Sequence, residues 1–271
     1  MESSKRVTFD TNTLDRVVRP ERFPKDPRSA DFYKVHDALK AGRLKGYFSG
    51  TIVTLEGIEK KDRTSVLGGT RVKSQMTHKF DEATAQETIN INMTPEQDRK
   101  PLHEEQQRRI VAALKIGMRA LKAPPRIGWI RIDDPDGSFF APDTDAKFTD
   151  RMNRSADVCT AIESRGLGYA LVKSIANELA KRDNVVNEMP MQSLGLAKDV
   201  HDEGRVKRAV SEWADADSIA AHIGYAIDLL CTEDQGKGAG APSVLDSTNR
   251  AWLEATYSVK FVTLSELAGM I

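Results

Sequence analysis

Short apolar segments alternate with helical patterns near the N-terminus. Residues 6–9 and residues 46–49 are strand candidates, because each is a short run rich in apolar or β-branched side chains. Residues 31–40 place apolar side chains at spacings of three and four, which predicts a helix between the two strands. We expect a further helix to begin within residues 51–59.

The last part of the chain shows the same alternation. The expected elements are a helix over residues 217–225, a strand over 227–231, a Gly-rich loop over 236–242, a helix over 249–257, a strand over 260–263 and a short helix over 264–270. Strands that alternate with helices are typical of one parallel sheet flanked by helices. The sequence therefore predicts a three-layer α/β/α fold.

The middle of the chain has a different pattern. Its expected elements are a β-hairpin within residues 71–92, an amphipathic helix over 104–122, a strand over 128–132 that ends at a turn over 133–137, and mostly helical structure over 146–213. We expect residues 1–60 and 206–271 to form the α/β core, and residues 61–205 to form a mainly helical insertion that contains the hairpin.

The charge balance narrows the ways in which this chain could bind nucleic acid. The 40 Lys and Arg residues match the 40 Asp and Glu residues, so the formal net charge is +0. No global positive field attracts a polyanion, and binding would need a local basic patch or a bound metal. A basic stripe on the predicted helix over 104–122 could form such a patch, with Arg108, Arg109, Lys115, Arg119 and Lys122, although a solvated polar face is the commoner explanation.

The sequence predicts neither a zinc site nor a secreted or membrane-spanning protein. Cys159 and Cys231 lie far apart and belong to no CxxC motif, which argues against a zinc site or a disulfide framework. The N-terminal residues are polar and charged, unlike a secretory signal. No apolar run approaches the roughly 18 residues that a membrane span needs. We therefore expect a cytoplasmic protein without a membrane partner.

Acidic residues occur where a parallel sheet would gather them. Asp10 follows the first predicted strand, Glu56 follows the second, and Asp234 follows the strand over 227–231. Asp215 and Asp217 open the late helix. The carboxyl ends of parallel strands border the ligand crevice, and acids brought together there repel one another unless a cation neutralises them or their pKa values rise. Oxygen ligands of this kind suit Mg²⁺ or Mn²⁺.

The segments around these acids resemble the PIN-domain nuclease family. Residues 10–12 (Asp-Thr-Asn) are similar to the opening motif of that family, and residues 49–56 are similar to its second strand and second acid. Residues 219–222 (Ile-Ala-Ala-His), followed by residues 229–234, are similar to the late block of VapC-like toxins in the family. The ending, residues 257–267, resembles the last strand and helix of the family.

The resemblance covers roughly residues 5–60 and 213–271, less than half of the chain. The third acid of the family usually stands three residues before the Ile of the late block. In this chain that position is Ala216, with Asp215 and Asp217 on either side, so either aspartate could serve. The middle of the chain is also much longer than in small PIN toxins.

The resemblance implies a metal-dependent endoribonuclease. Its catalytic residues would be Asp10, Glu56, Asp217 and Asp234, and Asp10, Glu56, Asp215, Asp217 and Asp234 would be the candidate ligands of Mg²⁺ or Mn²⁺. A bound metal lowers the pKa of water and clamps the scissile phosphate. Thr11, Asn12 and Thr232 would hydrogen-bond the acids or the phosphate. The implied partners are RNA, an antitoxin or another protein, and a second copy of the chain.

Simpler interpretations of the same residues stay open. Asp10 and Asp234 could be turn residues, Glu56 a solvated helix residue, and Asp215 or Asp217 a helix N-cap. Two other functional classes also fit the sequence: a catalytically inactive PIN-like scaffold protein, and a metal-dependent phosphohydrolase that acts on small phosphoesters.

Overall fold

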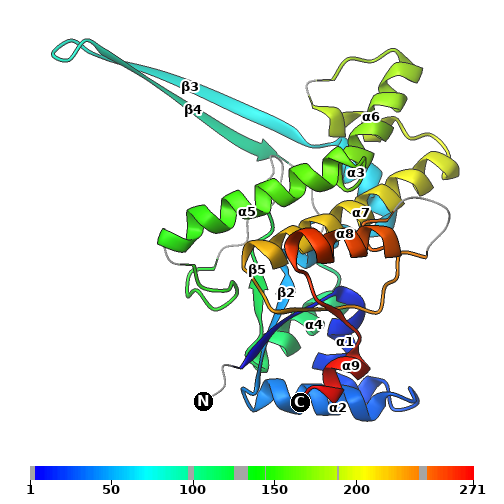
Figure 1. Cartoon of the computed structure of the whole chain (residues 1–271). Helices are drawn as coiled ribbons and strands as arrows, with labels where there is room; N and C mark the ends of the chain where they lie inside the picture. The colour runs from blue at the N-terminus through cyan, green and yellow to red at the C-terminus, as the bar shows by residue number, and fades with distance from the viewer. Residues whose placement is uncertain (1–3, 97–100, 125–133, 144, 188, 238–242) are drawn as a thin grey trace.

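A computed structural model of the 271-residue chain describes residues 4–96, 101–124, 134–143, 145–187, 189–237 and 243–271. Five parallel strands form its main sheet in the order β5-β2-β1-β6-β7, and Figure 1 labels β5 and β2 of this sheet. These strands are β1 (Lys5–Phe9), β2 (Leu44–Ser49), β5 (Arg119–Leu121), β6 (Leu229–Cys231) and β7 (Phe261–Val262). The register places Phe9 beside Phe48 and Cys231, so β1, β2 and β6 end at nearly the same level.

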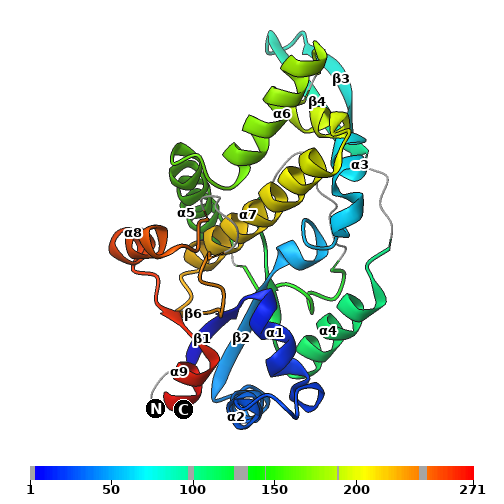
Figure 2. The same ribbon diagram turned by 90° about the vertical axis from the view of Figure 1, so that its right-hand side faces the viewer.

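Helices cover both faces of this sheet. On one side lie α1 (Thr11–Val18), α2 (Ser29–Lys40), α4 (Glu104–Lys115) and α9 (Leu264–Gly269); on the other lie α5 (Asp145–Ser164), α7 (Val200–Gly224) and α8 (Ser247–Tyr257). Val7 and Phe9 of β1 pack with the first group, and Leu230 of β6 packs with the second. This alternation along the strands gives three layers, visible edge-on in Figure 2, and confirms the predicted α/β class.

A second core lies beyond the sheet, around the N-terminal half of α7. It is formed with α3 (Arg63–Gly68), α6 (Tyr169–Asp183) and the 3₁₀ segment η4 (Pro190–Leu196). Trp213 of α7 is fully buried there, with the Tyr169 ring centroid 4.5 Å from its own. Because α7 is 25 residues long, one helix belongs to both cores.

The middle region also contains the predicted β-hairpin. Its strands, β3 (Arg71–Asp81) and β4 (Gln86–Glu96), pair antiparallel along their full length. The hairpin extends away from the rest of the molecule (Figure 1). The expected strand over residues 128–132 lies outside the described residues. Within the described ranges, no helix is both long and apolar enough to cross a membrane.

Three predictions about helices were wrong. Residues 51–59 do not begin an α-helix, because the chain forms a 3₁₀ segment, η2 (Gly50–Val53), and then a turn. The helix predicted over 104–122 ends at Lys115, where Gly117 adopts a φ of 83° and β5 follows. The helix expected to open at Asp215 and Asp217 begins instead at Val200, so both aspartates lie in its interior.

The division into core and insertion stays a prediction. One strand from within residues 61–205, β5, nevertheless pairs with β2 and forms an edge of the main sheet. The smaller 3₁₀ segments η1 (Pro20–Arg22) and η3 (Lys60–Asp62) connect the elements around the site described next.

Candidate active site

Asp10 lies at the carboxyl end of β1, where it caps helix α1. Its Oδ1 accepts a hydrogen bond from the backbone N–H of Thr11 at 2.7 Å. Its Oδ2 accepts from Asn12 Nδ2 at 2.6 Å and from Thr232 Oγ1 at 2.7 Å. Burial raises the pKa of Asp10, the bonds from Thr232 and Thr11 oppose that rise, and the nearby charge of Asp234 adds to it. The residue is therefore a helix cap that also belongs to a group of acids.

Glu56 stands in the turn after η2 and is tied to the same end of the sheet. Its two carboxylate oxygens accept from Thr11 Oγ1 at 2.5 Å and from Thr51 Oγ1 at 3.2 Å. Burial raises the pKa of Glu56, and the charge of Asp10 raises it further against these two hydrogen bonds. Thr11 thus holds two acids, one through its backbone N–H and one through its hydroxyl.

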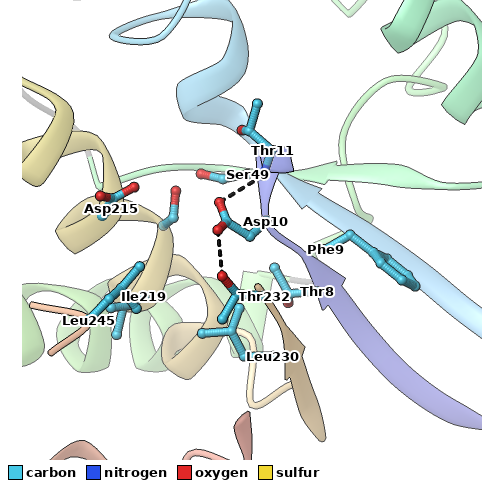
Figure 3. Close-up of a pocket in the computed structure, with 11 residues that line it drawn as sticks. Thr8, Phe9, Asp10, Thr11, Ser49, Asp215, Ile219, Leu230, Thr232 and Leu245 are labelled. Carbon is cyan, nitrogen blue, oxygen red and sulfur yellow. Dashed lines mark hydrogen bonds between the residues drawn. The ribbon is translucent and has the colours of Figure 1, made fainter. Parts of the chain in front are cut away.

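Asp215 approaches these acids from helix α7. It shares a small cavity of about 20 Å³ with Asp10, Ser49 and Thr232, and the two carboxylates lie on opposite sides of it (Figure 3). The pKa of Asp215 is raised well above its ordinary value, first by burial and then by the charges of Asp10 and Glu56. A space of this size has room for about one water molecule.

Asp217, which was also expected among the catalytic residues, is not among the residues that line that cavity or the larger groove described below. Its side chain is buried, and Cys159 Sγ of α5 lies 3.7 Å from its Oδ1. Two helical positions that differ by two residues point about 200° apart, so Asp215 and Asp217 cannot both face the sheet edge. Of the two candidates for the third acid, the structure brings Asp215 to the site.

Asp234 follows β6 and closes the group. Its backbone N–H donates to Thr232 Oγ1 at 3.1 Å, and its Oδ1 accepts from the backbone N–H of Gly236 at 2.8 Å. Arg250 of α8 donates to its carbonyl oxygen. The expected turn role is therefore present as well. We call Asp10, Glu56, Asp215 and Asp234 the acid cluster, because all four line one groove with a volume of about 600 Å³.

Glu212 is a further acid beside the cluster that the sequence analysis missed. It lies three residues before Asp215 on α7, which places both on one face of the helix. Its Oε2 accepts from the backbone N–H of Val244 at 3.0 Å. Burial raises the pKa of Glu212, and the charge of Asp234 contributes to the rise. The spacing of three would have revealed it had the helix start been recognised.

The groove also contains cations that the sequence analysis largely overlooked. Lys60, Arg63 and Arg109 line it together with the acid cluster. Arg63 is only 4% exposed and donates to the carbonyl of Lys207 at 2.6 Å and to Ser211 Oγ at 2.8 Å. Burial lowers the pKa of Arg63, whereas Glu56 and Asp215 act to raise it. The expected basic stripe thus contributes Arg109 to the groove, while Arg108 pairs with Glu104.

The donor chemistry of the acid cluster fits a hard divalent cation. All four side chains offer oxygen, and a 2+ charge would stabilise their ionised forms, three of which have pKa values raised first by burial and then by the charge of neighbouring acids. Mg²⁺ commonly keeps several waters and uses one or two carboxylates directly, which suits acids that are not tightly clustered. Residues Asp10, Glu56, Asp215 and Asp234 would hold it.

A tighter group of candidate ligands occurs elsewhere, at the start of α7. Among the described residues, Asp199, His201 and Asp202 bring three ligand atoms within 4.8 Å of one another. Asp199 caps the helix through the backbone N–H of Asp202, and Asp202 pairs with Arg182 at 2.5 Å. These contacts assign the group a structural role.

The chain matches no family model, no curated protein and no solved structure. What the structure itself shows of the expected family architecture is the parallel α/β sheet in the order β5-β2-β1-β6-β7.

Proposed function

We propose that this protein is a divalent-metal-dependent endoribonuclease of the PIN type. One observation carries the proposal: carboxylates from positions 10, 56, 215 and 234 converge in one groove at the carboxyl edge of a parallel sheet. That edge is where open α/β sheets bind their ligands. Four acids assembled from distant parts of the chain are costly for stability unless a cation is bound, which favours a functional site over a set of turn residues.

The acid cluster would hold Mg²⁺ or Mn²⁺. When bound, such a metal supplies an activated water and charge neutralisation at the scissile phosphate. Thr11, Asn12 and Thr232 hold the carboxylates through the hydrogen bonds described above, and so fix their positions before the cation and substrate arrive.

The cations of the groove support a nucleic-acid substrate. Lys60, Arg63 and Arg109 line it beside Glu59 and Glu105, and contacts between such cations and phosphate position a nucleic-acid backbone. Among the residues that line the groove, only Ile58 and Ala214 are aliphatic. Pockets for small molecules are usually lined mainly by apolar side chains, so a charged groove favours the polymer over a small phosphoester.

The test is cleavage of labelled single-stranded RNA and DNA with Mg²⁺ or Mn²⁺, comparing the wild type with Asp215→Asn and Asp217→Asn. The two variants change neighbouring aspartates of the same helix, and only the first lines the groove. We expect Asp215→Asn to reduce RNA cleavage on the order of 100-fold or more, because it removes a ligand charge. Asp217→Asn should keep the wild-type rate within a few-fold.

Other outcomes would contradict specific parts of the proposal. Equal losses in both variants, with folding intact by circular dichroism, would exclude the assignment of Asp215. A wild type that binds the metal by calorimetry but cleaves neither polymer would favour the inactive scaffold. Hydrolysis confined to small phosphoesters would replace the nuclease with a phosphohydrolase.

A further inference from the structure

The β3–β4 hairpin has two faces of opposite character. In an antiparallel pair, directly opposed residues project to the same face, and successive residues alternate between faces. The register pairs Met76 with Ile91 and Thr77 with Asn90. One face therefore carries the apolar residues Val72, Met76, Phe80, Ile89, Ile91 and Met93, with Ser74, His78 and Glu87 among them. The other carries Arg71, Lys73, Gln75, Thr77, Lys79, Asp81, Gln86, Thr88, Asn90, Asn92, Thr94 and Glu96, all polar.

The apolar face is open to water along the arm. The exposed fractions are 61% for Met76, 63% for Phe80, 50% for Ile89, 61% for Ile91 and 53% for Met93. From Val72 to Phe80 the stripe runs about 27 Å, at about 3.4 Å per residue. Soluble monomers rarely expose contiguous apolar patches above a few hundred Å², and an isolated two-stranded hairpin is only marginally stable in water. Both considerations call for a covering surface.

The composition of this face argues for an apolar, uncharged covering surface. Its ionisable side chains, His78 and Glu87, contact each other, with His78 Nδ1 3.0 Å from Glu87 Oε1. The face offers no Lys or Arg to a phosphate backbone, so nucleic acid is a poor match. An extended surface of the same apolar character is the complementary occupant.

The arrangement of the stripe is close to symmetric about its centre. Met76 and Ile91 form the central pair, and Val72 and Phe80 lie four residues to either side of Met76. A two-fold axis between two stacked arms, running across the strands at the level of the central pair, would lay Val72 over Phe80 and Ile89 over Met93 of the other arm. Self-complementarity of this kind is what an isologous dimer interface requires.

The area is also sufficient. Five large side chains at about half exposure or more present roughly 100 Å² each, so two arms packed together remove on the order of 1,000 Å² from water. That lies at the threshold for a specific interface before the backbone and the flanking residues are added. We propose that this face docks against the same face of a second copy of the chain, with the polar faces outward. The inference does not depend on the nuclease proposal.

The first test is the oligomeric state of the full chain, by sedimentation velocity across the micromolar range. The interface variant is Met76→Asp with Ile91→Asp; the matched control is Thr77→Asp with Asn90→Asp, one position along on the opposite face. We expect a wild-type dimer, a control that keeps it, and an interface variant with a dissociation constant on the order of 100-fold higher or more, because carboxylates would be buried unpaired.

A chemical cross-link provides an independent measurement. The native Cys159 and Cys231 are buried, so a single introduced cysteine is the accessible thiol among the cysteines of the chain. Met76→Cys lies near the proposed axis and should give a covalent dimer with a short bifunctional maleimide, whereas Thr77→Cys should not. A monomeric wild type would overturn the proposal and leave this face to another partner. Equal effects of the two aspartate pairs, or equal cross-linking at 76 and 77, would also overturn it.

Discussion

The acid cluster links the stability of the protein to pH through Asp215. Its pKa in the folded state lies well above the ordinary value of 3.8, because the carboxylate is buried among other acids. At a pH between 3.8 and the folded-state pKa, the folded protein therefore holds a proton on Asp215 that the unfolded chain has already released. Stability contributed by this proton is present below pH 3.8 and is lost as the pH rises towards the folded-state pKa. At neutral pH the metal-free protein carries the resulting penalty.

Replacing Asp215 with Asn should remove that penalty. We expect Asp215→Asn to raise the melting temperature of the metal-free protein at neutral pH by a few degrees, the size of shift that about 1 kcal/mol gives in a domain of comparable length. Mn²⁺ should raise the melting temperature of the wild type more than that of the variant. Thermal melts with and without metal, and with Asp217→Asn as control, measure both effects. A variant that melts lower without metal would contradict the account.

The sequence located three of the four acids in the cluster but left the third position open between two residues. Asp10, Glu56 and Asp234 follow strands, and the ends of parallel strands meet at one edge whatever the helices do. The choice between Asp215 and Asp217 depends on rotation about a helix axis. The sequence pattern places the helix start beside these residues, so it lets either aspartate turn towards the sheet and leaves Glu212 outside the predicted helix.

At the scale of elements, alanine substitutions at two glycines of α7 measure how closely each half of this helix packs against neighbouring elements. A Cβ built on Gly224 would lie 2.1 Å from Ser155 Oγ and 3.2 Å from the carbonyl oxygen of Arg151, both on α5. A Cβ on Gly204 meets nothing within 4 Å. Gly224→Ala should destabilise the protein by about 1–3 kcal/mol through overpacking, whereas Gly204→Ala should stabilise it by about 0.5–1 kcal/mol through helix propensity.

Chemical denaturation of both glycine variants measures these opposite signs under the same conditions. The comparison is controlled because both substitutions add one methyl group to the same helix. A stabilised Gly224→Ala variant would mean that α5 and α7 are less closely packed than the structure shows.

Element boundaries were the least predictable part of the fold. Met118 and Leu121 continue the apolar spacing of α4, so periodicity alone extends the helix through them. Gly117 and Met118 instead donate their backbone N–H groups to Leu114 and Ala113, a Schellman pairing that ends the helix and releases β5 into the sheet. The glycine was the available signal, but apolar periodicity masked it.

At the scale of the whole molecule, the predicted layers were recovered because they depend on a pattern repeated over many residues. Each central strand alternates between two buried faces, as Val7 and Thr8 do, and the flanking segments are amphipathic. The direction of the hairpin could not be predicted in this way. Its strands have an apolar face like those of any sheet, and only the structure shows that this face is left uncovered.

The absence of net charge makes a prediction about RNA binding by the whole molecule. With a formal charge of +0, phosphate contacts should come from the groove cations Lys60 and Arg109, since Arg63 is nearly buried and hydrogen-bonded within the protein. For single strands each neutralised phosphate contributes about −0.7 to the slope of log K against log salt, so two contacts give a slope of about −1.4. Filter binding by the Asp215→Asn variant at fixed Mg²⁺, over a KCl series, measures it.

A comparison of two neighbouring lysines distinguishes RNA binding in the groove from RNA binding by the general surface charge. Lys60 lines the groove, whereas Lys61 pairs with Glu59 at 2.8 Å and is not among the groove residues. Lys60→Gln should make the slope shallower by about 0.7, and Lys61→Gln should leave it unchanged. Equal effects of the two substitutions would show that RNA responds to the general surface charge. A slope near zero would remove phosphate contacts from the proposal, since a polyanion held by cations must release counterions when it binds.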